Sequence, residues 1–400
     1  MKEVAITGIG QTVFGAYPEK SVADLGREAI RAALKDAGLR WQDIQYLVAG
    51  IDPYSGGDWL LAGSTLQSNI GYIEVPATSI YNACASGGYC LDIGRALVLS
   101  QAYDIVLCVG AFKAPGGFFP TAGDSDDPYN FDASRFRLLG KTNPTMFAMQ
   151  ARRRMHNYGM TEEDIALVKV KNSRHGVLNP YARYRKEYTL EQVLSSAMVS
   201  SPLRLFEIAA TSDGAVAIIL CSMEKAKQFT AKPVRLASVW APQPAYPNTD
   251  TGLSHFATQC EISTQSTPAG TERVHEVRVA RGGLEQAGVG PEDLDLAEVY
   301  DLSTAMEYDW LEDIGICGPG EAERITREGA TTIGGRIPIN TSGGVSSSGE
   351  AIPAQALMQT CELVTQLRGN AGPRQVENAK VGLAVNKGLG NSISCIVVKS

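Results

Sequence analysis

The chain lacks any run of about 18 consecutive apolar residues, which is the length that a membrane-spanning helix needs. Its first eight residues, Met1 to Gly8, become polar too early for a secretory signal peptide. From these two absences we expect a protein without a membrane anchor or a secretory leader.

Histidine is scarce, and cysteine pairs are missing. The 4 histidines show no metal-ligand spacing, and the 8 cysteines include no C-x-x-C pair. Most of the cysteines stand in apolar stretches, which is typical of a reduced protein and argues against a disulfide scaffold. We therefore expect a cytoplasmic protein with no metal bound by this chain.

An excess of basic charge is also missing. The chain has 36 Lys and Arg against 43 Asp and Glu, a formal net charge of −7 at pH 7. No basic stripe marks a nucleic-acid surface, so we expect no nucleic-acid partner. What is abundant is glycine, with 41 residues, many in pairs that let backbone approach backbone or a ligand closely.

The most informative residue is Cys84. It stands in a run of small residues between the extended stretch Val75 to Ile80 and the helical spacing of Tyr89 to Leu99. This places the thiol on a strand-to-helix turn, where unpaired N–H groups and the helix dipole favour an anion and predict a lowered thiol pKa. The local residues leave a second interpretation open, in which Cys84 is a small buried hydrophobe.

The chain contains a faded duplication. Residues 27–50 and 278–300 each read as an amphipathic helix stopped by glycine, a short acidic connection and an apolar strand, offset by 250 positions at Gly38 and Gly288. The alternation predicts an α/β fold with sheets covered by helices. We divide the chain into halves at residues 1–231 and 232–400.

The first half is interrupted at about residues 115–202. Gly116 to Arg137 has no period and is expected to be a loop, Asn143 to Tyr158 is helical, and Thr161 caps another helix. We interpret this segment as an inserted domain over the surface of the first half. Long excursions of this kind are more often functional than idle.

A set of motifs in a fixed order runs through nearly the whole chain: Asn82-x-Cys84-x-Ser86-Gly87, Lys171-Asn172, Asn179-Pro180, Ser212-Asp213-Gly214-Ala215, Glu298-Val299-Tyr300-Asp301, Asn340-x-Ser342-Gly343-Gly344, Gln366-Leu367-Arg368-Gly369 and Asn386-x-Gly388-Leu389-Gly390. With these motifs the chain resembles the thiolase superfamily, in its sterol-carrier-protein-type branch. The resemblance implies two similar βαβαβαββ halves in a five-layered α-β-α-β-α body, with a loop domain in the first half that helps to bind coenzyme A.

The resemblance also implies the chemistry. The cysteine matching Cys84 attacks a 3-oxoacyl-CoA and becomes acylated, the C–C bond breaks, and coenzyme A as co-substrate removes the acyl group. The backbone of Gly390, with Gly388, matches an oxyanion donor, although a tight turn before the last strand explains both glycines equally well. Such proteins are homodimers or dimers of dimers, and several work with a small zinc-binding OB-fold subunit.

Several residues are candidates for binding coenzyme A. Arginines could receive its phosphates by charge-assisted bonds, although arginines on a helix are more often solvated. Paired glycines would let the backbone pass close to Cys84. The candidates are Arg152, Arg183, Arg185, Ser212, Gly343 and Gly344.

The chain departs from the family at its helper residues. Where the family has Gly-His-Pro, this chain has Gly349-Glu350-Ala351, so Glu350 replaces a catalytic histidine. The family's His-Asp-Cys-Phe reads Tyr300-Asp301-Leu302-Ser303 here, and the place of a second catalytic cysteine is near Asn386. Of the usual catalytic set, only Cys84 is present.

Three interpretations remain open. We favour a modified thiolase in which Glu350, with a pKa raised by burial, replaces histidine as base or proton carrier and Tyr300 donates to an oxyanion. Its substrate would be aromatic or carboxylated, as in benzoylsuccinyl-CoA thiolase-like enzymes. The second is a retro-aldolase like the steroid side-chain aldolases, which share the Tyr-Asp motif and Gly-Glu-Ala but lack the cysteine and carry tyrosine where Ile352 stands. The third is a non-catalytic acyl-CoA or lipid-binding protein, in which Tyr300 is a core residue and Glu350 only complements a helix dipole.

Overall fold

The computed structural model describes residues 3–68, 70–71, 73–115, 142–230, 232–244 and 274–400. The predicted loop from Gly116 to Arg137 therefore lies outside the described residues. The strands are β1 (Val4–Gln11), β2 (Tyr46–Ile51), β3 (Ala77–Ser79), β4 (Ile105–Phe112), β5 (Met198–Ser200), β6 (Leu203–Arg204), β7 (Gly214–Ser222), β8 (Val234–Trp240), β9 (Leu296–Val299), β10 (Val381–Lys387) and β11 (Ile393–Lys399). The helices are α1 (Val22–Ala37), α2 (Ala62–Ser68), α3 (Ser86–Leu99), α5 (Asn143–Tyr158), α6 (Glu162–Leu178), α7 (Leu190–Leu194), α8 (Met223–Ala226), α9 (Val274–Ala287), α10 (Met306–Ile314), α11 (Ala322–Arg327), α12 (Gly344–Ser348) and α13 (Gln355–Leu367).

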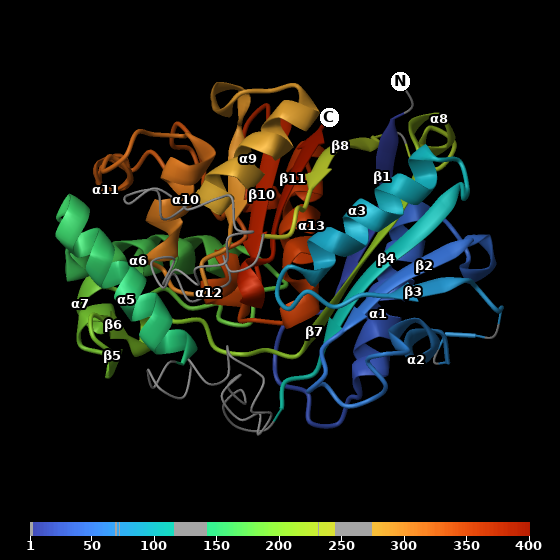
Figure 1. The fold of residues 1–400 in the computed structure, drawn as a ribbon, viewed down its shortest axis with the longest axis horizontal. Coiled ribbons are helices and arrows are strands. Elements are labelled where there is room, and N and C mark those ends of the chain that lie inside the picture. Colours follow the sequence, from blue (N-terminus) through green and yellow to red (C-terminus); the bar gives the residue numbers. More distant parts are fainter. Residues whose placement is uncertain (1–2, 69, 72, 116–141, 231, 245–273) are drawn as a thin grey trace, which may run out of the picture.

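The strands of both halves meet edge to edge in one mixed sheet. Its order is β3-β2-β4-β7-β1-β8-β11-β10-β9, and the halves join where β1 and β8 pair antiparallel, with Ile6 opposite Val234. Helices α1 and α2 cover the outer face of the first half, and α9 covers that of the second. Helices α3 and α13 pack against each other and against strands of both halves (Figure 1). The predicted α/β fold, with two similar halves and layers of helices, is confirmed.

The predicted duplication is visible in matching helix ends. Helix α1 ends at Ala37 with Gly38 at φ 65°, and α9 ends at Ala287 with Gly288 at φ 66°. Only glycine adopts this left-handed backbone at no steric cost, which is why both helices stop at the same point of the repeat. A short 3₁₀ turn and a strand follow in each half, β2 in the first and β9 in the second.

The inserted segment contributes two long helices, α5 and α6. Helix α5 has the bounds that the sequence predicts. Helix α6 begins in a capping box, because Thr161 Oγ1 accepts from the Asp164 N–H at 3.2 Å and the Asp164 carboxylate accepts from the Thr161 N–H at 2.8 Å. Helix α6 packs against α12 in the second half. The insertion thereby reaches the segment that leads to Glu350.

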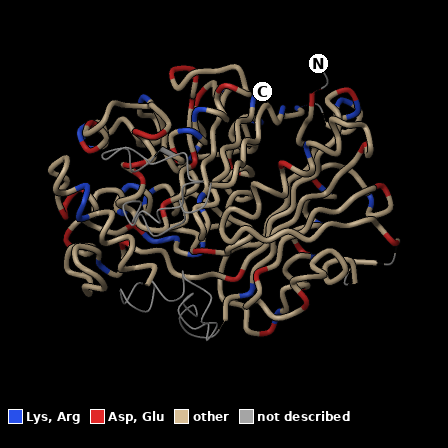
Figure 2. The backbone as a smooth tube through the Cα atoms, viewed as in Figure 1, with Lys and Arg blue, Asp and Glu red and all other residues tan. Residues whose placement is uncertain are grey.

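Charge on the described residues is mixed rather than sorted into regions. Figure 2 shows Lys and Arg interspersed with Asp and Glu around the molecule. Across the described ranges, none of the helices combines the length and the apolar character that crossing a bilayer requires.

Candidate active site

Cys84 lies on a strained turn between β3 and α3, two residues before the helix begins. Ala83 has φ +47°, a left-handed value that a residue with a Cβ adopts only when its surroundings impose it. The Ser86 hydroxyl accepts from the Asn82 N–H at 2.8 Å and donates to the Ala83 carbonyl at 2.6 Å, and so closes the turn. The predicted strand-to-helix position of the thiol is confirmed.

Glu350 is delivered by the chain that leaves α12. Its N–H donates to the Ala210 carbonyl at 2.7 Å, and its carbonyl accepts from the Ser212 N–H at 2.8 Å. Gly349 precedes it at φ 77°, and a Cβ there would lie 2.1 Å from Ser212 Oγ. The glycine is required by backbone angle and by space, and Ser212 positions the segment.

Cys84, Glu350 and Tyr300 converge on one carboxylate oxygen. Cys84 Sγ donates to Glu350 Oε1 at 2.8 Å, and the Tyr300 hydroxyl donates to the same oxygen at 3.0 Å. The three residues are 6%, 4% and 3% exposed, respectively. Tyr300 follows β9, so three segments far apart in the chain bring a thiol, a base and a phenol together.

The residue after Tyr300 ties this corner to α12. The Asp301 carboxylate accepts from the Val345 N–H at 2.6 Å and the Ser346 N–H at 3.3 Å, and from Asn172 Nδ2 at 2.9 Å. Burial and the nearby Glu307 raise the pKa of Asp301 to about 7. These contacts fix the segment that carries Tyr300 relative to α12, the helix that precedes Glu350.

The electrostatics differ from the expectation at the thiol. Burial, and then the neighbouring Glu350 carboxylate, raise the pKa of Cys84 well above its ordinary value, whereas the sequence analysis expects it lowered. The field at a helix start is outweighed because the thiol is desolvated and faces an anion. Burial also raises the pKa of Glu350, as expected. The resting proton therefore belongs on sulfur, with a carboxylate acceptor in hydrogen-bond contact.

These groups stand in the wall of a cavity of about 690 Å³, a size ordinary for small-molecule sites. Its walls are mainly apolar and aromatic, with Phe147 from α5 and Phe206 from the turn that follows β6 among them. Cys84, Glu350 and Tyr300 are part of the wall, so a ligand in the cavity reaches the thiol.

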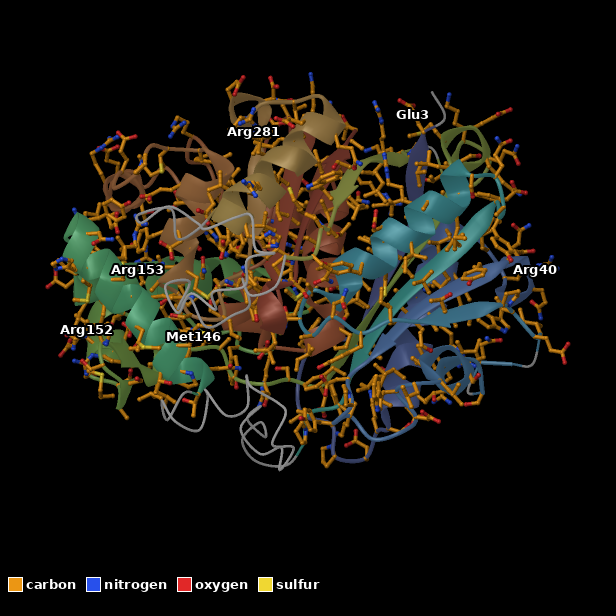
Figure 3. All side chains as sticks on the ribbon, in the orientation of Figure 1. Glu3, Arg40, Met146, Arg152, Arg153 and Arg281 are labelled. Atoms are coloured by element: carbon orange, nitrogen blue, oxygen red, sulfur yellow. The ribbon has the colours of Figure 1, made fainter. Side chains whose placement is uncertain are left out.

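The three predicted coenzyme A arginines do not line this cavity. Exposed Arg152 on α5 hydrogen-bonds Ser201, and Arg185 donates to the Val177 carbonyl at 3.2 Å. Arg183 donates to the Thr211 carbonyl. Figure 3 shows Arg152 toward the outer edge of the molecule, farther out on α5 than Met146. A role for these arginines with phosphates stays a prediction.

The predicted glycines divide by what they touch. A Cβ on Gly344 would lie 2.5 Å from Asp301 Oδ2, and one on Gly343 would lie 2.5 Å from Gly176 Cα, so this pair serves the packing of α12 rather than an approach to Cys84. Gly390 lies on an exposed turn with open space around it. Gly388 is the glycine against the thiol turn, because a Cβ there would lie 3.0 Å from Cys84 N.

Sequence reasoning missed two features of the cavity wall. Lys169 on α6 is a buried cation in that wall, and Tyr81 in the wall donates to the buried Asp52 carboxylate at 2.7 Å. The Lys169-x-Lys171 spacing on a helix was visible in the sequence, but which lysine faces a cavity depends on packing. Within the part of the chain that the structure describes, no cluster of three or more His, Cys, Asp or Glu is arranged to hold a metal ion.

A duplicated α/β body with a buried thiol–carboxylate pair beside a large cavity defines a class of enzyme that works on a small molecule through cysteine. The family description "Thiolase, N-terminal domain" matches residues 3–189, and "Thiolase C-terminal domain-like" matches residues 257–400. The chain belongs to the thiolase family and is a thiolase-type acyltransferase. The family uses coenzyme A as a co-substrate.

Similar proteins cover nearly the full chain. An acetyl-CoA acetyltransferase from Methanothermobacter thermautotrophicus is 34% identical over 97% of both chains. The benzoylsuccinyl-CoA thiolase subunit BbsB from Thauera aromatica is 30% identical over 94% of this chain and 92% of its own. Among solved structures, the Ltp2-ChsH2(DUF35) aldolase superposes with a TM-score of 0.80 at 27% identity, covering 100% of this chain and 98% of its own.

Proposed function

We propose that this chain makes or breaks the C2–C3 bond of a 3-oxoacyl-CoA through an acyl-Cys84 intermediate. The observation that carries the proposal is the hydrogen bond of 2.8 Å from Cys84 Sγ to Glu350 Oε1, in the wall of the large cavity. A nucleophile in contact with a base, both open to a ligand space, is the arrangement that covalent catalysis needs.

Glu350 would serve both proton transfers of the cleavage. It takes the Cys84 proton as sulfur attacks the C3 carbonyl, and the C2–C3 bond then breaks with its electron pair moving to the CoA-bearing enolate. The Glu350 carboxyl returns the proton to C2 of that enolate. Coenzyme A next loses its thiol proton to Glu350 and attacks the acyl-Cys84 carbonyl, and the departing sulfur takes the proton back.

Tyr300 would stabilise the oxyanion that forms at C3. In the resting site its hydroxyl is bound to Glu350 at 3.0 Å. Once Glu350 is protonated it is a poorer acceptor, so the phenol can turn its donor to the new oxyanion, together with the Cys84 N–H. Gly388 instead shapes the turn, since its own N–H donates to the Ser392 carbonyl at 2.7 Å.

We further propose an aromatic or carboxylated acyl group, a homodimer or dimer of dimers, and a small zinc-binding OB-fold partner. A relative named as a subunit and a neighbour that is a two-component complex support the partner. The free cysteines in the described ranges support a reducing, cytoplasmic location.

A retro-aldolase is the second candidate, and the aldolase neighbour with a TM-score of 0.80 favours it. It would act without free coenzyme A, release an aldehyde or ketone, and tolerate the loss of Cys84. A non-catalytic binder would hold acyl-CoA without turnover.

The deciding experiment is intact mass spectrometry after brief exposure to a 3-oxoacyl-CoA. The wild-type chain should gain one acyl group, Cys84→Ala should gain none and lose coenzyme A-dependent cleavage, and Cys317→Ala should behave as wild type because Cys317 lies outside the cavity wall. Sustained coenzyme A-dependent cleavage by Cys84→Ala would falsify the proposal.

A further inference from the structure

Lys169 is a buried cation in the cavity wall that forms no ion pair with a residue described in the structure, although the charge of the nearby Asp301 raises its pKa in opposition to burial. It is 5% exposed, and no carboxylate of the described ranges lies within ion-pair distance of its Nζ. The other lysine in the wall, Lys387, pairs with Glu276 at 2.9 Å. Lys171, two residues further along the same helix, pairs with Glu307 at 2.7 Å. Of these three lysines, only Lys169 forms no ion pair with a described residue.

The ammonium group of Lys169 has donors left for a guest. It has three N–H groups. One donates to the Ser346 carbonyl at 2.6 Å, and the Tyr188 ring lies 5.5 Å away. Burial lowers the pKa of Lys169 to about 8, so the group is still mainly protonated at neutral pH. A buried cation of this kind is costly to keep, and an anionic ligand would offset that cost.

The position of Lys169 identifies which part of a substrate it would meet. Its acceptor Ser346 lies four residues before Glu350 and also donates its N–H to Asp301, the neighbour of Tyr300. Lys169 is therefore anchored to the same short segment as the proposed base. The phosphates of coenzyme A are separated from its thioester by the whole pantetheine arm. An anion that reaches Lys169 while the acyl carbonyl reaches Cys84 thus belongs to the acyl group.

We propose that Lys169 binds a carboxylate on the acyl group, so that the substrate is a 3-oxoacyl-CoA whose chain ends in a carboxylate. This inference rests on the proposed function and names its substrate class. The surrounding wall is mostly apolar, with Phe147, Leu205 and Phe206, so a chain with one terminal charge matches one cation that lacks an ion pair.

The test uses two substrates of equal length, 3-oxoadipyl-CoA and 3-oxohexanoyl-CoA, which differ in a terminal carboxylate against a methyl group. The wild-type chain should prefer the carboxylated one in kcat/KM by on the order of 10-fold to 100-fold, the worth of one charged hydrogen bond. Lys169→Met keeps the unbranched stem and should lose the preference, so that the ratio of kcat/KM for the two substrates falls to near unity whatever the absolute rate of acylation. Lys186→Met, an exposed lysine beside the same Tyr188 ring, should keep it.

A binding arm separates this inference from the proposed function. Calorimetry of the wild-type chain with adipyl-CoA and hexanoyl-CoA, which lack the 3-oxo group, should show tighter binding of adipyl-CoA that Lys169→Met abolishes. Equal use and equal binding of the paired compounds by the wild-type chain would overturn the inference. An adduct on Lys169 trapped by borohydride would also overturn it, because such an adduct means that Lys169 forms an imine with the keto group instead of binding a carboxylate. Acylation of Cys84 without any preference for the carboxylated substrate would contradict only the carboxylate site at Lys169. Selective binding of the carboxylated compound without an acyl-enzyme would contradict only the proposed acyl-Cys84 mechanism.

Discussion

Glu350→Gln tests the site most directly. The substitution keeps the size of the side chain and an oxygen that can accept from Tyr300, but it removes the group that can take the proton from Cys84 Sγ at 2.8 Å. The cavity wall and the thiol turn are left in place. Any loss of rate then reports on proton transfer rather than on binding.

The magnitude follows from the two roles assigned to one carboxyl group. Positioned acid–base catalysis contributes about 10²-fold to 10⁴-fold for each proton transfer. Glu350 receives the thiol proton and returns it to the enolate, so kcat/KM should fall by at least ~10⁴-fold, which is about 5 kcal/mol of barrier. The acylation rate of Cys84, followed by intact mass at fixed pH, measures the first of these transfers alone.

Stability provides a second readout. A carboxyl group whose folded-state pKa is raised by burial stabilises the fold at low pH and loses that contribution as pH rises through the folded pKa. Glutamine does not ionise and has no such loss, so the free energy of unfolding of the variant should be ~1 kcal/mol higher than that of the wild-type chain at neutral pH. Higher thermal stability with lost acylation would separate a catalytic role from damage to the fold.

The matched control is Glu207→Gln. Glu207 is 1% exposed, burial raises its pKa to about 7, and its side chain is not part of the cavity wall. It should acylate Cys84 at the wild-type rate. Acylation of Cys84 by Glu350→Gln at the wild-type rate would refute the assignment of Glu350 as base.

Three further predictions concern the same site. Tyr300→Phe should lower kcat by ~10-fold to 1000-fold with little change in KM, since the phenol acts on the oxyanion; an unchanged kcat in steady-state assays counts against that role. Gly388→Ala should cost about 1–3 kcal/mol in chemical denaturation and slow acylation, because its Cβ would meet the Asn82 carbonyl at 2.5 Å and shift the Cys84 turn; wild-type stability would contradict the crowding. Because burial raises the pKa of Glu350, the acid limb of kcat/KM should lie above the ordinary 4.5; a limb at or below that value in a pH–rate profile would disprove it.

Much of the fold was predictable because its signals are local. Gly38 and Gly288 stop matching helices, and Thr161 caps α6, so the duplication and the insertion are readable from residues close in the chain. The position of Cys84 on its turn is local in the same sense. The resemblance to thiolases then supplied Glu350 and Tyr300 as candidates.

What failed depends on packing between distant segments. Cys84 and Glu350 are 266 residues apart, and the direction of the thiol pKa follows from burial against that carboxylate rather than from the helix that begins beside it. That Gly388 meets the thiol turn follows from the way the chain folds back after β10, and the role of Gly390 as an oxyanion donor stays a prediction. Lys169 differs from Lys171 only in what surrounds it.

The carboxylate changes the physics of activating a thiol. A neutral histidine that takes a proton from a thiol creates two opposite charges in a desolvated site, whereas Glu350 moves one negative charge from oxygen to sulfur without adding any. Burial raises the pKa of both groups, and that of Cys84 well above its ordinary value, so the resting proton stays on sulfur. The balance then rests on Tyr300, which bonds Glu350 Oε1 while that oxygen is charged and is freed when it is protonated. The transfer of the proton from Cys84 to Glu350 thus also releases the Tyr300 hydroxyl to donate to the oxyanion. The transfer becomes favourable when the keto group of the substrate is present, because the attack of sulfur on that group creates the oxyanion.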